Sequence, residues 1–205
     1  MSIKAVAFDL FGTLVQIGQP TQPFGKLLEQ IGRPPAESKF LRRLIMTKNE
    51  GLAGIANALG GDISLAKLAE IESALYEELA SVHLFPESLE VLDTLRSKGI
   101  KIGIASNLAA PYAVPVKILL PAMDVEVWSF DVGAVKPEPA FFEQVIAGFG
   151  FDANEILMVG DNGKNDVAGA RAAGIQARLI QRVEPRDSES LETLRDVLTV
   201  VARNR

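Results

Sequence analysis

The chain has no cysteine and only one histidine, His83, among its 205 residues. Disulfide bonds and thiolate chemistry are therefore excluded, and the histidine is expected at the surface. Acidic residues outnumber basic ones, 26 to 21, and the aromatic residues, 6% of the chain, do not interleave with basic ones, so a nucleic-acid partner is not expected. The absence of cysteine fits a reducing compartment, no stretch is long and apolar enough to span a membrane, and the N-terminus lacks the layout of a signal peptide, so we expect a cytoplasmic protein.

The chain does have recurring short apolar runs within a composition that is 48% hydrophobic and 23% charged. Runs rich in valine and isoleucine lie at 5–8, 100–105, 125–130, 156–159 and 176–180. Helical periodicity occurs at 87–98, 112–120, 139–149, 166–173 and 189–202. Buried strands that alternate with helices predict an α/β fold, a doubly wound parallel sheet.

One segment, residues 16–82, interrupts this alternation because it contains no convincing strand. Its helical patterns lie at 24–31, 37–48, 52–59 and 65–80, with breaks at Gly and Pro residues. We therefore predict an α/β core formed by residues 1–15 and 83–205, with an all-helical cap formed by residues 16–82.

Polar side chains follow several of the predicted strands. Asp9, Ser106 with Asn107, and Asp161 come at strand ends, and Lys136 lies in the loop after another strand. Ligands of open parallel sheets bind beyond the carboxyl ends of the strands, so we expect these groups at one edge of the sheet.

Each of these groups has a structural and a chemical interpretation. Asp9 is either an Asx turn or a carboxylate nucleophile, with Thr13 donating hydrogen bonds near the site. Ser106 and Asn107 either cap the next helix or contact substrate oxygens. Lys136 is either a solvated loop lysine or a point charge that holds the nucleophile and an anionic substrate together.

An acidic cluster is predicted where Asp9 meets Asp161 and Asp166, and Lys136 offsets only one of its negative charges. Such a cluster would repel an anionic substrate unless a cation is bound. Hard carboxylate oxygens suit Mg²⁺. Asp166 is also a candidate helix N-cap, and Asn165 is a candidate for either capping or ligand orientation.

Four segments carry a family resemblance: FDLFGTL at 8–14, IASN at 104–107, VKPEP at 135–139 and VGDNGKND at 159–166. With these segments in this order, the chain resembles the haloacid dehalogenase-like (HAD) hydrolase superfamily, most of whose members are phosphatases or phosphotransferases. The resemblance extends over most of the predicted core, and residues 16–82 resemble the helical cap of many members. It implies that Asp9 is the nucleophile, that Ser106 binds the transferred group and that Lys136 stabilises charge.

The resemblance also implies that Asp9, Asp161, Asp166 and the backbone carbonyl of Phe11 hold Mg²⁺. Phe11 is nevertheless a departure from the family pattern. Phosphatases of the family carry a second aspartate at that position, which protonates the leaving group and then activates water. General acid–base help of this kind contributes roughly 10²–10⁴-fold to the rate, and Phe11 cannot supply it.

Three hypotheses follow. The first is a Mg²⁺-dependent phosphatase of a small phosphorylated substrate, slowed by Phe11. The second is a 2-haloacid dehalogenase, a branch that resembles this chain in having an aromatic residue at that position but works without metal and lacks an acid at the position of Asp161. For the carboxylate of a haloacid, Arg33, Arg42 and Arg43 are candidates, although they are also typical surface helix charges. The third is a non-catalytic protein that binds a phosphorylated ligand.

Overall fold

The computed structural model describes residues 2–33, 38–183 and 190–204. Within these residues, five parallel strands form one sheet in the order β5-β4-β1-β6-β7, as the predicted α/β fold requires. The strands of this sheet are β1 (Ala5–Phe8), β4 (Lys101–Ser106), β5 (Val125–Trp128), β6 (Ile156–Gly160) and β7 (Gln176–Leu179). The chain adds β4 and β5 on one side of β1 and β6 and β7 on the other, so the direction of strand addition reverses at β1.

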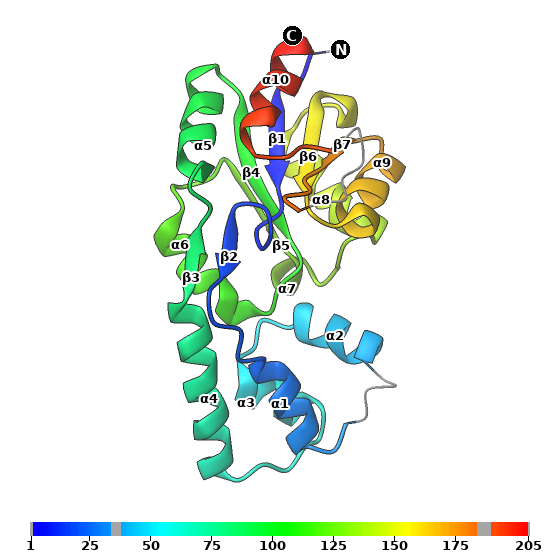
Figure 1. Cartoon of the computed structure of the whole chain (residues 1–205). Helices are drawn as coiled ribbons and strands as arrows, with labels where there is room; N and C mark the ends of the chain where they lie inside the picture. Colours follow the sequence, from blue (N-terminus) through cyan, green and yellow to red (C-terminus); the bar gives the residue numbers. More distant parts are fainter. Residues whose placement is uncertain (1, 34–37, 184–189, 205) are drawn as a thin grey trace.

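Helices cover both faces of the sheet, and its strands are therefore buried on both sides (Figure 1). On one face the residues of α5 (Ser88–Ser97), α6 (Ala113–Leu119) and α10 (Arg195–Arg203) pack against Val6 and Phe8 of β1. On the other face α8 (Pro139–Phe149) and α9 (Gly169–Ala172) pack against Ala5 and Ala7. Short turns complete this part of the chain: η2 (Ala110–Tyr112), α7 (Ser129–Val132), η3 (Ala153–Glu155) and η4 (Gly163–Ala168).

Four helices lie together beyond one end of the sheet, and we call them the helical layer (Figure 1). They are α1 (Pro23–Gln30), α2 (Ser38–Met46), α3 (Leu52–Ala58) and α4 (Leu65–Ala80). Their apolar faces form a hydrophobic cluster separate from the two clusters of the sheet. No helix in the described parts of the chain is long and apolar enough to cross a membrane.

The expectation that residues 16–82 contain no strand is wrong. Val15–Ile17 forms β2 and Val82–Leu84 forms β3, and the two pair antiparallel where the chain leaves the sheet for the helical layer and returns from it. His83 is exposed in β3, as expected of a surface residue. Each strand has only three residues, and its partner is more than 60 residues away, so no local pattern marks the pair.

The predicted helix at 189–202 begins later in the structure than expected. The expected starts at Glu37 and Glu189 lie outside the described residues. Residues 190–194 are described and precede α10, which begins at Arg195. Leu191 instead bridges to Ile180, with its N–H donating to the Leu179 carbonyl at 2.8 Å, and this tertiary pairing replaces the first helical turns.

Candidate active site

A cleft of about 950 Å³ lies between the carboxyl ends of the strands and the helical layer. β1 is at its floor, between β4 and β6, where the order of strand addition reverses. Parallel sheets bind ligands at such a reversal, because the loops after the two neighbouring strands diverge and leave a crevice. The lining includes Asp9 after β1, Ser106 at the end of β4, Asp161 after β6, and residues of α2.

The Asp9 carboxylate is held by two buried donors. The Ser106 hydroxyl donates to Asp9 Oδ1 at 2.9 Å, and Lys136 Nζ donates to the same oxygen at 2.7 Å. Lys136 also donates to the Ala105 carbonyl at 2.6 Å. Among the described residues Asp9 Oδ2 has no such partner, so it is the oxygen available to a ligand in the cleft.

The Asn107 side chain bonds the loop that carries Lys136 and does not cap the next helix. Its amide Nδ2 donates to the Lys136 carbonyl at 2.9 Å, and its Oδ1 accepts from the Lys136 N–H at 2.7 Å. This pair of hydrogen bonds fixes the loop backbone that carries the lysine, and the following α6 has its N-cap at Tyr112. Asn107 also lines the cleft, and the second N–H of its amide is not used in these two bonds.

The three predicted acids do come together. Asp9, Asp161 and Asp166 each offer a carboxylate oxygen within 4.8 Å of the other two. Lys136 Nζ lies 2.6 Å from Asp166 Oδ1 in a fully buried ion pair, and Asp166 Oδ2 accepts from the N–H of Asn162 at 2.9 Å. The oxygens of an octahedral Mg²⁺ site, at 2.0–2.1 Å from the ion, lie about 3–4 Å apart, so this donor set fits that ion after a small contraction.

The helical turn after Asp161 is capped by Asn162, not by Asp166 or Asn165. The Asn162 side chain accepts from the N–H groups of Lys164 and Asn165, at 3.1 and 2.9 Å. The capping interpretation of Asp166 and Asn165 is therefore wrong, because the turn begins at Gly163, earlier than the predicted start. The Asp166 carboxylate lies at the cleft floor instead, 1% exposed, between Lys136 and the N–H of Asn162.

The charges of the site shift its protonation equilibria. Desolvation raises the pKa of Asp161 to about 6, and the negative charges of Asp9 and Asp166 act in the same direction. Burial disfavours the charged form of Lys136, but the Asp9 and Asp166 carboxylates outweigh it and raise the pKa of the lysine. Burial also raises the pKa of Asp166, against the opposing charge of Lys136. The site therefore carries excess negative charge that a cation would offset.

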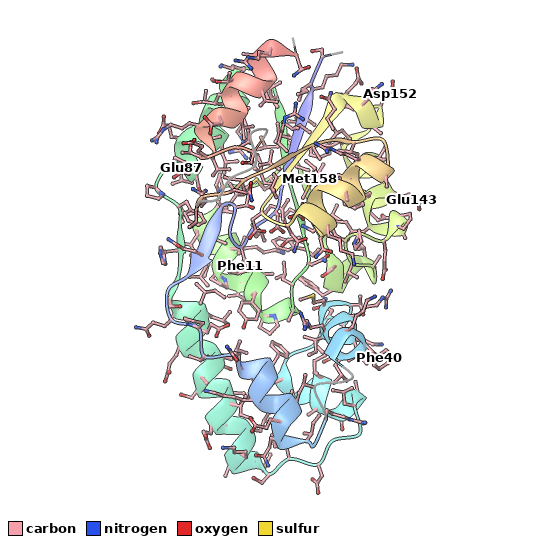
Figure 2. The ribbon with its side chains drawn as sticks, turned by 45° about the vertical axis from the view of Figure 1, so that its right-hand side comes forward. Phe11, Phe40, Glu87, Glu143, Asp152 and Met158 are labelled. Carbon is pink, nitrogen blue, oxygen red and sulfur yellow. The ribbon has the colours of Figure 1, made fainter. Side chains whose placement is uncertain are left out.

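Phe11 and Thr13 lie in the loop after Asp9 and differ in their access to the cleft. Phe11 lines the cleft and packs edge-to-face on Tyr112, with ring centroids 5.8 Å apart. Figure 2 shows Phe11 between the sheet and the helical layer. Thr13 is fully buried and is not part of the cleft lining, so the structure does not support the predicted contact with substrate.

Arg182 is a residue of this site that no sequence pattern indicates. Its guanidinium donates to the carbonyls of Thr13, at 2.8 Å, and Gly12, at 3.4 Å, and it also pairs with Glu87 at 2.7 Å. The group lies 3.6 Å from the centre of the Phe85 ring. Arg182 thus clamps the loop that follows the nucleophile candidate from a point 170 residues away along the chain.

Comparison with known proteins identifies the family. The family of haloacid dehalogenase-like hydrolases matches residues 3–174, most of the chain. The protein is a haloacid dehalogenase-like hydrolase. The phosphoglycolate phosphatase of Rhodospirillum rubrum is 30% identical to it over 190 residues, which cover 84% of this chain and 77% of that protein. Arg182 lies beyond the end of the family match.

Solved structures of the HAD family share this fold. The HAD phosphatase from Thermococcus onnurineus superimposes with a TM-score of 0.69 at 25% identity, covering 99% of this chain and all of that one. The 2-haloacid dehalogenase from Pseudomonas syringae superimposes with a TM-score of 0.63 at 22% identity, covering 98% and 99% of the two chains. Phosphatases and dehalogenases thus share the architecture, and the side chains of the cleft must distinguish between the two reactions.

Proposed function

We propose that this protein is a Mg²⁺-dependent phosphohydrolase that uses Asp9 as nucleophile on a small phosphorylated substrate. The observation that carries the proposal is the Asp9 carboxylate, held through Oδ1 by Ser106 and Lys136 beside two further acids. The phosphatase names among the relatives at about 30% identity support the same reaction. In this proposal residues 16–82 are a cap on a core of residues 1–15 and 83–205, and the enzyme works in the cytoplasm.

The reaction follows from which atoms of the site are free. Asp9 Oδ2 attacks the phosphorus, and the bond to the leaving oxygen breaks with its electron pair remaining on that oxygen. Water then attacks the resulting aspartyl phosphate and releases inorganic phosphate, and the carboxylate is restored. Ser106 and Lys136 keep Oδ1 in place and supply a hydroxyl dipole and a positive charge beside the transferred group.

Asp9, Asp161, Asp166 and the backbone carbonyl of Phe11 are the proposed ligands of Mg²⁺. Bound there, the ion supplies Lewis-acid charge stabilisation to the phosphoryl oxygens. The acidic donors and the raised pKa of Asp161 support a cation at this position.

Phe11 determines which substrates this site would turn over well. No proton donor stands at that position, so the leaving oxygen must depart without protonation from Phe11. Aryl and acyl phosphates meet this condition because their leaving groups are stable anions, whereas sugar phosphates do not. We therefore propose that the enzyme is fast on the former and slow on the latter, by an amount within the roughly 10²–10⁴-fold range of general acid catalysis.

Phosphate release from p-nitrophenyl phosphate, with and without Mg²⁺, tests this function. We expect Mg²⁺-dependent activity of the wild type on this aryl phosphate and no phosphate release after Asp9→Asn, while Phe11→Asp should speed the otherwise slow reaction on an alkyl phosphate. Asp93→Asn is the matched control, since Asp93 is exposed on α5 and away from the cleft. If Asp9→Asn keeps the wild-type rate, Asp9 is not the nucleophile and the proposal fails.

The dehalogenase alternative is favoured by one observation, the aromatic side chain of Phe11 in the cleft. A departing halide needs no proton, so the absence of a general acid at Phe11 does not slow that reaction. Asp161 argues against it, because a metal-free reaction on an anionic haloacid gains nothing from a third acid. Halide release from 2-haloacids in the presence of a chelator would favour the dehalogenase. Mg²⁺-dependent binding of phosphate without turnover of either substrate would favour the non-catalytic protein.

A further inference from the structure

One face of α2 forms the roof of the cleft. Lys39, Arg42, Arg43 and Met46 all line it, at the spacing i, i+3, i+4 and i+7 that places side chains on one side of a helix. Phe40 also lines the cleft and is 67% exposed; Figure 2 shows it on α2, in the helical layer. This face therefore presents both positive charge and apolar surface to whatever occupies the cleft.

The cations of the roof are used unequally within the protein. Arg43 is paired, since its Nε and Nη2 donate to the Glu138 carboxylate at 2.6 and 3.0 Å. The side chains of Lys39 and Arg42 have no ion pair or hydrogen bond with the described parts of the chain. Arg33, the other arginine predicted as a candidate anion ligand, donates to the Leu59 carbonyl inside the helical layer and does not line the cleft.

The cleft is thus electrically divided. Its floor holds Asp9, Asp161 and Asp166, where a cation would be bound, and its roof carries the unpaired charges of Lys39 and Arg42. Lys164, in the turn after Asp161, adds a further positive charge to the lining from the side of the floor. Apolar side chains of Phe11, Phe40 and Met46 line the same cleft. A ligand that complements all three regions has a phosphoryl group at the floor, an apolar body, and a second anion at the roof.

We propose that α2 selects substrates that carry a second oxyanion, a carboxylate or a second phosphoryl group, and that Arg42 is the residue that binds it. This assignment rests on the proposed phosphohydrolase function, which places the phosphoryl group of the substrate at the floor of the cleft. The positive charges of the roof are observed independently of that function. Arginine fits because its planar guanidinium offers two parallel donors to a carboxylate or phosphoryl group. Lys39 adds a point charge from one helical turn away.

Binding of aryl phosphonates, which cannot be hydrolysed at phosphorus, tests the assignment without any turnover. Titration calorimetry with Mg²⁺ present would compare phenylphosphonate, 4-phosphonobenzoate and 1,4-phenylenediphosphonate, which share one apolar body. We expect at least one of the two doubly anionic ligands to bind about tenfold more tightly than phenylphosphonate, the size of one charge-assisted hydrogen bond. The doubly anionic ligand with the larger increase in affinity identifies the second anion as a carboxylate or a phosphoryl group.

Variants of α2 localise the effect. Arg42→Gln should bring the affinity ratio between doubly and singly anionic ligands close to one, and Arg42→Lys should keep part of it. Lys48→Gln is the control, because it removes a positive charge just beyond α2 from an exposed side chain that does not line the cleft, and it should leave the ratio as in the wild type.

Two results would overturn the proposal, and they differ from failure of the proposed function. The first is that phenylphosphonate binds but a second anion does not increase the affinity, or that the increase in affinity persists in Arg42→Gln. Arg42 then does not bind a second oxyanion, and the proposed phosphohydrolase function still stands. If none of the three phosphonates binds, both the roof assignment and the phosphohydrolase fall.

Discussion

Replacing Lys136 by methionine removes the only cation buried at the floor of the cleft in the described residues. The lysine is 3% exposed and pairs with Asp9 at 2.7 Å and with Asp166 at 2.6 Å. Methionine keeps most of the side-chain volume, so the change is mainly the loss of charge. Removing one partner of a buried ion pair costs about 3–5 kcal/mol, because the other partner stays desolvated and uncompensated. We expect Lys136→Met to lower the free energy of unfolding by about 3 kcal/mol at pH 8 without Mg²⁺.

The pH dependence of this loss has a defined sign. Burial and neighbouring negative charge raise the pKa of Asp161 to about 6 and raise that of Asp166, so the folded state takes up protons that the unfolded state does not bind until about pH 4. In the wild type the charge of Lys136 lowers both pKa values, so its removal raises them further. Lowering the pH from 8 towards 5 therefore stabilises the variant more than the wild type, because protons replace the missing ammonium group. The loss caused by Lys136→Met should shrink over this range, and saturating Mg²⁺ at pH 8 should reduce it as well.

Urea denaturation of the wild type, Lys136→Met and Lys101→Met measures the effect. Lys101 pairs with Asp124 at 2.7 Å, but the lysine side chain is 58% exposed. A pair of this kind contributes about 0.2–1 kcal/mol because water screens it. If the two variants lose the same stability at pH 8 without Mg²⁺, the buried cluster does not depend on its lysine and the reasoning is refuted.

Four further predictions concern the surroundings of the acids. Gly12→Ala should lower stability by more than about 1 kcal/mol and weaken Mg²⁺ binding, because Gly12 has φ +83° and a Cβ there would lie 2.1 Å from Asp161 Oδ2. Mg²⁺ affinity, measured by calorimetry, should fall as the pH drops below about 6, where Asp161 gains a proton. Tyr112→Phe should cost about 1–2 kcal/mol in urea denaturation, because its hydroxyl donates to the buried Glu78 carboxylate. Arg182→Met should lower both stability and kcat on p-nitrophenyl phosphate, because the loop after Asp9 loses its clamp.

Each variant has a matched control elsewhere in the chain. Gly99→Ala has a similar positive φ, +74°, with no atom within 4 Å of the added Cβ, so a Mg²⁺ affinity that falls equally in both glycine variants would contradict the steric argument. Tyr76→Phe removes a hydroxyl from a residue that is 65% exposed and should be neutral. Arg195→Met breaks a surface pair with Glu90 and should leave kcat unchanged. Equal losses in a variant and its control would remove the proposed cause, and a flat pH dependence of Mg²⁺ affinity would exclude Asp161 as a ligand.

The elements of the α/β core were readable from the sequence because burial has a local signature. Ala5–Phe8 and Ile156–Gly160 are buried along their whole length, and a strand buried on both faces reads as a continuous apolar run. The floor of the cleft was readable for a related reason. Asp9 and Asp161 follow directly after two such runs, and parallel neighbours bring their carboxyl ends to one edge.

The short pairings were not readable. β2 and β3 have three residues each, too few for a periodic pattern, and their pairing joins segments at opposite ends of the helical layer. The helix cap after β6 was also not among the candidates, Asp166 and Asn165, because Asn162 is an equally good capping residue and only the backbone geometry decides which side chain accepts the hydrogen bonds.

The sequence by itself determined the strands and helices of the core, the family and the acids after β1 and β6, because each depends on residues close together along the chain. Tertiary structure alone decided what those groups contact: that Asn107 braces the lysine loop, that Arg182 clamps the loop after Asp9, and that α2 places unpaired cations over an acidic floor. These contacts join residues from about 30 to 170 positions apart. They form only when the two core clusters and the helical layer have packed, and packing is a property of the whole chain rather than of any segment.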